Sequence, residues 1–251
     1  MKKFLILLGR EMGGSFHQPL AYVVMFFFLF LTGFNFHAGV TLLNHAAGTT
    51  TMVEAFFNTG YFWFPFLLVF PLITMRVFAE EIKLGTIEPL MTAPVRDWQV
   101  VLAKYCGALL FYLILWIPSL GYFAVFQSVT SMDAAGAASS LVGAYTMLLL
   151  IGMLYTALGC LGSTLTDNQI VAAVISFSAI VFLFFLGLLS FFVPAEGPFV
   201  QELTYYLSPI QHMMDYSRGI FDTRPLVFYL SSTFVVIFVT FHVFQHRRWR
   251  T

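Results

Sequence analysis

The stretch from Phe78 to Val95 reads Phe-Ala-Glu-Glu-Ile-Lys-Leu-Gly-Thr-Ile-Glu-Pro-Leu-Met-Thr-Ala-Pro-Val. It collects charge in a chain of which only 10% of the residues are charged, and an apolar run long enough to cross a bilayer lies on each side of it. Gly85 is expected to end the incoming helix, Thr86 to cap a new one, and Glu88 to lie in its first turn. That helix should stop before Pro94, because the residue ahead of a proline is disfavoured in helical geometry. The sequence therefore predicts a short polar helix over residues 85–92 between two membrane spans.

The composition indicates a membrane protein. Of the 251 residues, 59% are hydrophobic, 31 are Phe, and the mean hydropathy is +0.86. Soluble domains are nearer 45–50% apolar with about 25% charged residues. The formal net charge is zero, so no basic surplus points to nucleic acid. Cys106 and Cys160 lie inside apolar runs, where a thiol behaves as a small hydrophobic group rather than as half of a disulfide.

Six apolar runs have about the length that a 30 Å hydrocarbon core requires. The second contains Pro65 and Pro71, which predict kinks that neighbouring helices can accommodate. We expect an all-α integral membrane protein that forms a single transmembrane domain over residues 1–251. The predicted spans are Leu20–Phe36, Tyr61–Phe78, Tyr105–Gln127, Leu141–Leu165, Ile170–Phe192 and Leu226–Phe244.

Residues 1–18 are expected to form a helix that lies in the membrane interface. Phe4, Leu7, Leu8 and Met12 share one face at helical spacing, while the charged residues of this segment were assigned to the polar side. An ordinary frayed tail is the alternative. A cleaved signal peptide is not expected, because Arg10 and its neighbouring glutamate interrupt the apolar run.

The distribution of basic residues predicts the orientation. If the spans alternate, only Arg218 and Arg224 lie on one side, and ten basic residues lie on the other. Basic residues favour the cytoplasmic side, so both termini and the 85–92 helix should be cytoplasmic, with 37–60 as the first outer loop. The ten are Lys2, Lys3, Arg10, Arg76, Lys83, Arg96, Lys104, Arg247, Arg248 and Arg250.

The outer segment over residues 193–225 mixes aromatic and polar residues. It is too apolar for free solvent and too interrupted to span, which favours short re-entrant helices in the outer leaflet. Ser208 and Pro209 suit the start of such a helix, and Gly219 suits its end. A soluble ectodomain is the alternative reading, although about thirty residues are few for a core.

No nucleotide-binding or metal-binding motif occurs in the sequence. It contains neither a Gly-x-x-x-x-Gly-Lys-Ser/Thr loop nor a His-Glu-x-x-His or Cys-x-x-Cys pattern. Arg76 and Lys104 lie near span ends, from which they are expected to reach the cytoplasmic surface. The spans thus lack the central ionisable groups of an ion-coupled transporter.

At this point the sequence resembles the ABC-2 type exporter permeases, and most closely the gliding-motility-type permease subunit. The resemblance covers nearly the whole chain, with its most specific part in the segment between spans 2 and 3. Pro89 and Arg96 depart from the family pattern. The resemblance is carried by Arg10, Glu11, Phe16, Pro19, Ala21, Tyr22 and Val23; by Glu80, Glu81, Gly85, Thr86, Ile87, Glu88, Leu90, Thr92, Pro94, Val95, Asp97 and Trp98; and by Leu207, Ser208, Pro209, Arg218, Gly219, Asp222 and Thr223.

The resemblance implies that residues 85–92 form a coupling helix that docks on a separate cytoplasmic ATPase subunit. That subunit would bind ATP and Mg, and this chain would bind no cofactor and catalyse no reaction. The membrane partner would be a second copy or a paralogous subunit, which could carry a periplasmic domain, and the location would be the bacterial cytoplasmic membrane. The residues assigned to coupling are Glu80, Glu81, Gly85, Thr86, Ile87, Glu88, Leu90, Met91, Thr92 and Pro94, and those assigned to the outer re-entrant segment are Ser208, Pro209, Arg218, Gly219 and Asp222.

Three classes of function follow from these observations. The leading one is the membrane half of an ATP-driven exporter, extruder or force-transmitting complex. The second is a structural or assembly subunit that anchors an ATPase and a periplasmic partner without conducting substrate. A membrane enzyme is the weakest, because no polar constellation supports it. The glutamates of the 78–95 stretch could also be ordinary solvated interface residues.

Overall fold

The computed structural model describes residues 2–45, 50–86, 95–130, 138–189 and 205–248, and every regular element in these ranges is a helix. Six of the described helices are long and apolar enough to cross a membrane, which confirms an all-α integral membrane protein. They are α2 (Pro19–His45), α4 with α5 (Gly60–Thr74 and Ala79–Lys83), α7 (Asp97–Val129), α9 (Ala138–Leu165), α10 (Gln169–Leu188) and α13 (Thr223–Arg248).

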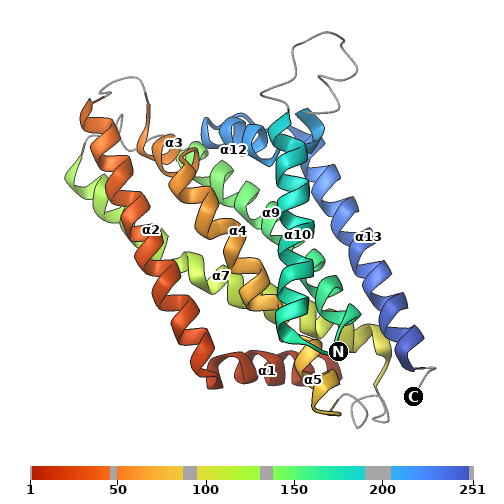
Figure 1. Ribbon diagram of the computed structural model, residues 1–251. Helices are drawn as coiled ribbons and strands as arrows, with labels where there is room; N and C mark the ends of the chain where they lie inside the picture. The colour runs from red at the N-terminus through yellow and green to blue at the C-terminus, as the bar shows by residue number, and fades with distance from the viewer. Residues whose placement is uncertain (1, 46–49, 87–94, 131–137, 190–204, 249–251) are drawn as a thin grey trace.

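Three further helices lie at the ends of this bundle. Helix α1 (Lys2–His17) lies across one end, where α5 and both chain termini are also found, and α3 (Met52–Phe57) and α12 (Pro209–Ser217) lie at the opposite end (Figure 1). The two ends are called the α1 end and the α12 end below. The predicted N-terminal helix is confirmed, since Leu7 is buried against the bundle while Leu5 and Ile6 are exposed.

Helix α9 is the centre of the bundle and contacts α3, α4, α5, α7, α10, α12 and α13. Close approach is possible because small residues face its neighbours. At Gly159, an added Cβ would lie 2.7 Å from the Cβ of Thr74 on α4, so no larger residue fits without displacing that helix. In a membrane, where lipid is as apolar as the core, such close backbone packing is a main source of helix association.

A continuous set of aromatic rings fills the core between α3, α4 and α7. Phe62, Phe66 and Phe70 repeat at helical spacing along α4, and each is at most 2% exposed. Phe66 contacts Phe70 edge to face with centroids 5.1 Å apart, and Phe62 lies 5.7 Å from Trp116 of α7. Such pairs contribute about 0.5–1.5 kcal/mol each beyond their buried area. The many Phe residues of the sequence are thus partly accounted for by an aromatic core.

The expected outer loop over residues 37–60 is wrong. Helix α2 continues to His45, and α3 follows with five of its six residues at most 3% exposed. Thr51 and Glu54 form the start of α3, where the Glu54 amide donates to Thr51 Oγ1 at 3.3 Å. Asn35 of α2 fixes α3 in place by donating its amide to the Phe56 carbonyl at 2.9 Å. The Thr-x-x-Glu spacing is the capping signal that could have predicted this helix.

Candidate functional site

A buried lysine is the centre of a charged cluster at the α1 end. Lys104 of α7 is 2% exposed, and its Nζ lies 3.1 Å from Glu11 Oε2 and 3.0 Å from Glu81 Oε1. The same Nζ donates to the Val77 carbonyl at 2.9 Å and lies 5.5 Å from the centroid of the Phe78 ring. A buried charge is tolerated when it is paired and hydrogen-bonded in this way.

The expectation that Lys104 reaches the membrane surface is therefore wrong. Sequence reasoning began the third span at Tyr105, which left Lys104 outside it. The helix begins at Asp97, so Lys104 lies inside α7 with its side chain turned toward α1 and α5.

Arg10 completes the cluster from the outside. Its Nη2 lies 2.7 Å from Glu81 Oε1 and 3.3 Å from Glu11 Oε1, while half of its side chain remains exposed. Two cations and two carboxylates therefore alternate in one group, drawn from α1, α5 and α7. We call Arg10, Glu11, Glu81 and Lys104 the ionic cluster.

Glu11 joins this cluster because of its position on α1. It follows Leu7 by four residues and Leu8 by three, which places it on the apolar face of the helix rather than on the polar face assigned from the sequence. Leu7 packs against the bundle, and this contact holds the Glu11 carboxylate against Lys104. An acidic residue on the buried face of an amphipathic helix was the signal that sequence reasoning missed.

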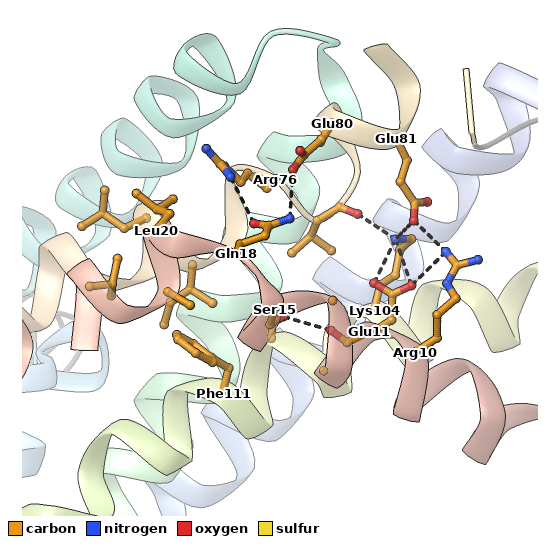
Figure 2. A pocket seen from close by; sticks show the side chains of 18 of the residues that line it. Arg10, Glu11, Ser15, Gln18, Leu20, Arg76, Glu80, Glu81, Lys104 and Phe111 are labelled. Atoms are coloured by element: carbon orange, nitrogen blue, oxygen red, sulfur yellow. Dashed lines mark hydrogen bonds and ion pairs between the residues drawn. The ribbon is translucent and has the colours of Figure 1, made fainter. Parts of the chain in front are cut away.

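A second polar group lies beside the ionic cluster. The side-chain amide of Gln18 accepts a hydrogen bond from Arg76 Nη1 at 3.1 Å and donates to Glu80 Oε2 at 3.5 Å. Gln18 therefore lies between a guanidinium and a carboxylate of opposite charge (Figure 2). Neither Arg76 nor Glu80 forms an ion pair with any residue that the structure describes.

These two groups line a cavity of about 430 Å³ between α1, α2, α4, α5 and α7. In Figure 2 the ionic cluster lies on one side of the cavity, and Leu20 and Phe111 lie on another. Further apolar lining comes from Ala21 and Val24 of α2 and from Leu72 and Ile73 of α4, and Val77, Leu84 and Ala108 also line the cavity. The cavity is therefore charged toward α1 and α5 and apolar toward α2 and α4.

The second span is broken where it approaches this cavity. Sequence reasoning expected one run from Tyr61 to Phe78, but α4 ends at Thr74 and α5 begins at Ala79. Ser163 of α9 replaces the missing helical contacts, because its Oγ accepts from the amides of Phe78 and Ala79 at 3.0 and 3.1 Å and donates to the Met75 carbonyl at 3.2 Å. The break is thus held by side chains of α7 and α9.

The predicted end of the incoming helix at Gly85 is confirmed. Helix α5 ends at Lys83, and Gly85 has a φ of 68°, a conformation that glycine adopts without strain. Thr86 is exposed and its hydroxyl lies 3.5 Å from the Glu81 carbonyl. The predicted coupling residues Ile87, Glu88, Leu90, Met91, Thr92 and Pro94 lie outside the described residues.

At the α12 end, the predicted short helix is present. Ser208 caps α12 by accepting from the Gln211 amide at 3.4 Å, and Pro209 is the first helical residue. Gly219 has a φ of 80° and donates to the Tyr216 carbonyl, while the next amide donates to Asp215, each at 3.0 Å. These paired bonds satisfy the last carbonyls of the helix. Residues 193–204 of the predicted outer segment lie outside the described part of the chain.

Arg218 and Asp222, which were also predicted for the outer segment, connect α12 to α3 and to the start of α13. Arg218 lies 3.9 Å from Glu54 of α3, which joins the two short helices of this end. Asp222 accepts from the Arg224 amide at 2.9 Å, and its carbonyl accepts from the Tyr216 hydroxyl. These contacts indicate a structural role at the entrance to α13.

His212 is buried under α12 in an aromatic environment. It is 1% exposed, its Nδ1 lies 3.3 Å from the Tyr229 hydroxyl, and its Nε2 has no partner among the described residues. Burial lowers the pKa of His212 to about 4, against the opposite effect of the Asp215 and Asp222 carboxylates. The imidazole is therefore neutral near pH 7 and serves as a packed core group.

Among the described residues, no group of three or more His, Cys, Asp or Glu side chains is arranged to hold a metal ion. Cys106 and Cys160 are both free thiols.

Comparison with known families identifies the class of protein. No curated protein sequence matches the chain. A family model, described as ABC-2 family transporter protein, matches residues 35–244, which is most of the chain and includes α3 to α12 and nearly all of α13. The chain therefore belongs to the ABC-2 family of transporter proteins and is a membrane permease subunit of an ABC transporter.

Proposed function

We propose that this permease couples ATP hydrolysis by a separate cytoplasmic ATPase to export, extrusion or force transmission, and that the ATPase docks on residues 85–92. Membership of the family implies an ABC ATPase as partner. The resemblance to the gliding-motility type suggests a second copy or a paralogous subunit beside it in the membrane. ATP and Mg would be bound by the ATPase, because the sequence has no phosphate-binding loop.

The observation that carries this proposal is the ionic cluster. The 85–92 segment lies in the sequence between α5 and α7, and both of these helices contribute charges to the cluster. The ion pair between Lys104 and Glu81 therefore links α7 to α5. Arg10 and Glu11 link both helices to α1. A displacement of the segment would be passed to three helices together, which is what an attachment point for an external motor requires.

The proposed orientation places the α1 end in the cytoplasm of a bacterial cell, with the permease in the cytoplasmic membrane. The described basic residues support it, since Arg10, Arg76 and Lys83 lie at that end, and Arg218 and Arg224 at the other. Single cysteines placed at Thr50 and Ala135, in a variant without Cys106 and Cys160, should react with an impermeant thiol reagent in intact cells. A cysteine at Glu88 should be protected, and its labelling would reverse the orientation.

The docking site is tested by substitutions within residues 85–92. Leu90→Asp places a charge in the proposed contact with no arranged partner, so the ATPase should be lost almost completely from tagged permease after detergent extraction. Leu90→Ala should weaken retention more than Glu88→Gln does, because buried apolar anchors carry more binding energy than rim charges. Permease abundance is the control. If Leu90→Asp retains the ATPase while changes in the Arg247 to Arg250 tail release it, the docking site is at the C-terminus.

The alternative is a subunit that anchors the ATPase without conducting substrate. Both functions predict retention of the ATPase, so retention alone does not separate them. Reconstituted complex in vesicles separates them, because only a transporting or force-transmitting permease makes ATP hydrolysis respond to substrate. Extracts of the native membrane supply the candidate substrates for this assay.

A further inference from the structure

Two opposite charges in the cavity at the α1 end have no ionic partner among the residues that the structure describes. The cavity is lined by three basic and three acidic side chains, but four of these neutralise one another in the ionic cluster. The remaining two, Arg76 and Glu80, are separated by the neutral amide of Gln18. The Nε of Arg76 is buried and has no hydrogen-bond partner in the described part of the chain. The unneutralised part of the cavity is therefore a dipole with a cationic and an anionic end.

The same cavity has a wall that suits hydrocarbon. Leu20 and Val24 line it from α2, Leu72 and Ile73 line it from α4, and Phe111 lines it from α7. Leu72 is 40% exposed, so this wall opens to the surface of the bundle. The charged residues lie toward α1, which is an amphipathic helix at the end of the spans, where headgroups are found. The change from polar to apolar thus runs in the same direction as in a lipid molecule.

We propose that this cavity binds a zwitterionic phospholipid with an ethanolamine headgroup. The lipid phosphate would accept hydrogen bonds from the Arg76 guanidinium, which is a planar donor suited to phosphate. The ammonium would donate to the Glu80 carboxylate, and one acyl chain would lie along the wall formed by α2 and α4. The lipid belongs to the leaflet in which α1 lies.

The charges select this headgroup over the other common ones. An anionic phospholipid would satisfy Arg76 but would bring its negative charge near Glu80 without a compensating cation. A choline headgroup has a cation that cannot donate a hydrogen bond to Glu80. A free phosphate or phosphoethanolamine would leave the apolar wall unfilled.

The test uses the purified full chain in nanodiscs that contain equal amounts of phosphatidylethanolamine, phosphatidylcholine and phosphatidylglycerol. Each lipid is supplied in turn with the same photoactivatable acyl chain, and cross-linked peptides of α2 and α4 are quantified. Wild-type protein should label with the ethanolamine lipid roughly tenfold above the other two, the ratio expected from one charge-assisted hydrogen bond. Glu80→Gln should abolish the preference over phosphatidylglycerol, and Arg76→Gln should lower labelling by all three lipids.

A pair of glycines on α1 separates cavity occupancy from general charge effects. Gly14 lines the cavity and Gly9 does not, and an added Cβ meets nothing within 4 Å at either position. Gly14→Leu should fill the cavity and remove the selective labelling while both charges remain. Gly9→Leu should label like the wild type.

Each of three results would overturn the proposal. Equal labelling by the three lipids would show ordinary annular contact, and wild-type labelling in Gly14→Leu would place the lipid elsewhere. Complete displacement by free phosphoethanolamine would show a headgroup site that does not involve a lipid chain. Melting temperatures of the variants show that each is folded before it is compared.

Discussion

Replacing Lys104 by Met removes the central charge of the ionic cluster while keeping a long apolar side chain. The ammonium contacts both carboxylate oxygens of Glu11, the nearer of them, Oε2, at 3.1 Å. It also contacts Glu81 Oε1 at 3.0 Å and the Val77 carbonyl at 2.9 Å. Without it, Arg10 is the one cation in the described part of the chain that still pairs with Glu11 and Glu81, and Arg10 is half exposed and therefore screened. Removing one member of a buried ionic group costs about 3–5 kcal/mol, because the remaining charges are left uncompensated.

The assay is thermal unfolding of the purified permease in one mild detergent, followed by tryptophan fluorescence. For a chain of this length, 3–5 kcal/mol corresponds to a decrease in melting temperature on the order of 10 °C. Arg10→Gln is the matched control, and it should cost less than about 1 kcal/mol because the pair it removes is exposed on one side. Adding Glu81→Gln to Lys104→Met should recover part of the loss. The reasoning fails if Lys104→Met has the melting temperature of the wild type, or if Arg10→Gln melts at a lower temperature than Lys104→Met.

Three further predictions follow from packing, titration and local stability. Gly159→Ala should destabilise the bundle by roughly 1–3 kcal/mol in a denaturant titration, because its Cβ would overlap Thr74, whereas Gly121→Ala, whose Cβ meets nothing within 4 Å, should be neutral or stabilising. The free energy of unfolding should fall as the pH is lowered from about 6.5 to about 4, because His212 binds a proton in the unfolded chain but stays neutral when it is buried in the folded one. In melting curves recorded across this pH range, His212→Gln should remove about 3 kcal/mol of the pH dependence. Backbone amides of α5 should exchange hydrogen faster than those of α4, as measured by mass spectrometry, and equal protection would contradict the break between them.

Hydropathy predicts the six spans because the bilayer thickness sets their length. Helix termini were less accurate, since apolar content does not report where a helix extends beyond the hydrocarbon, as α2 does to His45 and α7 does from Asp97. Local rules worked where a single residue fixes the backbone. Gly85 and Gly219 both have positive φ, and Ser208 caps α12.

The charged cluster could not be predicted in the same way, because it depends on which faces of three helices meet. Glu11, Glu81 and Lys104 are far apart in the sequence, and each alone resembles an interface residue near the end of an apolar segment. The spacing of Glu11 from Leu7 indicated a buried face, but only the packing of α1 on α7 supplies its partner. The coupling residues beyond Thr86 remain a sequence prediction.

The break between α4 and α5 gives the proposed coupling a mechanical basis. Helix α4 is held by aromatic packing, which resists displacement because every shift opens a void. The start of α5 is held in part by hydrogen bonds to Ser163 and by the ion pair between Lys104 and Glu81, and it lacks the ring-on-ring packing that fixes α4. A force applied to residues 85–92 would therefore be absorbed first at residues 75–78, with α1 and the start of α7 following through the ionic cluster. On the proposed function, the ATPase moves this outer layer as one piece against an aromatic core that stays in place.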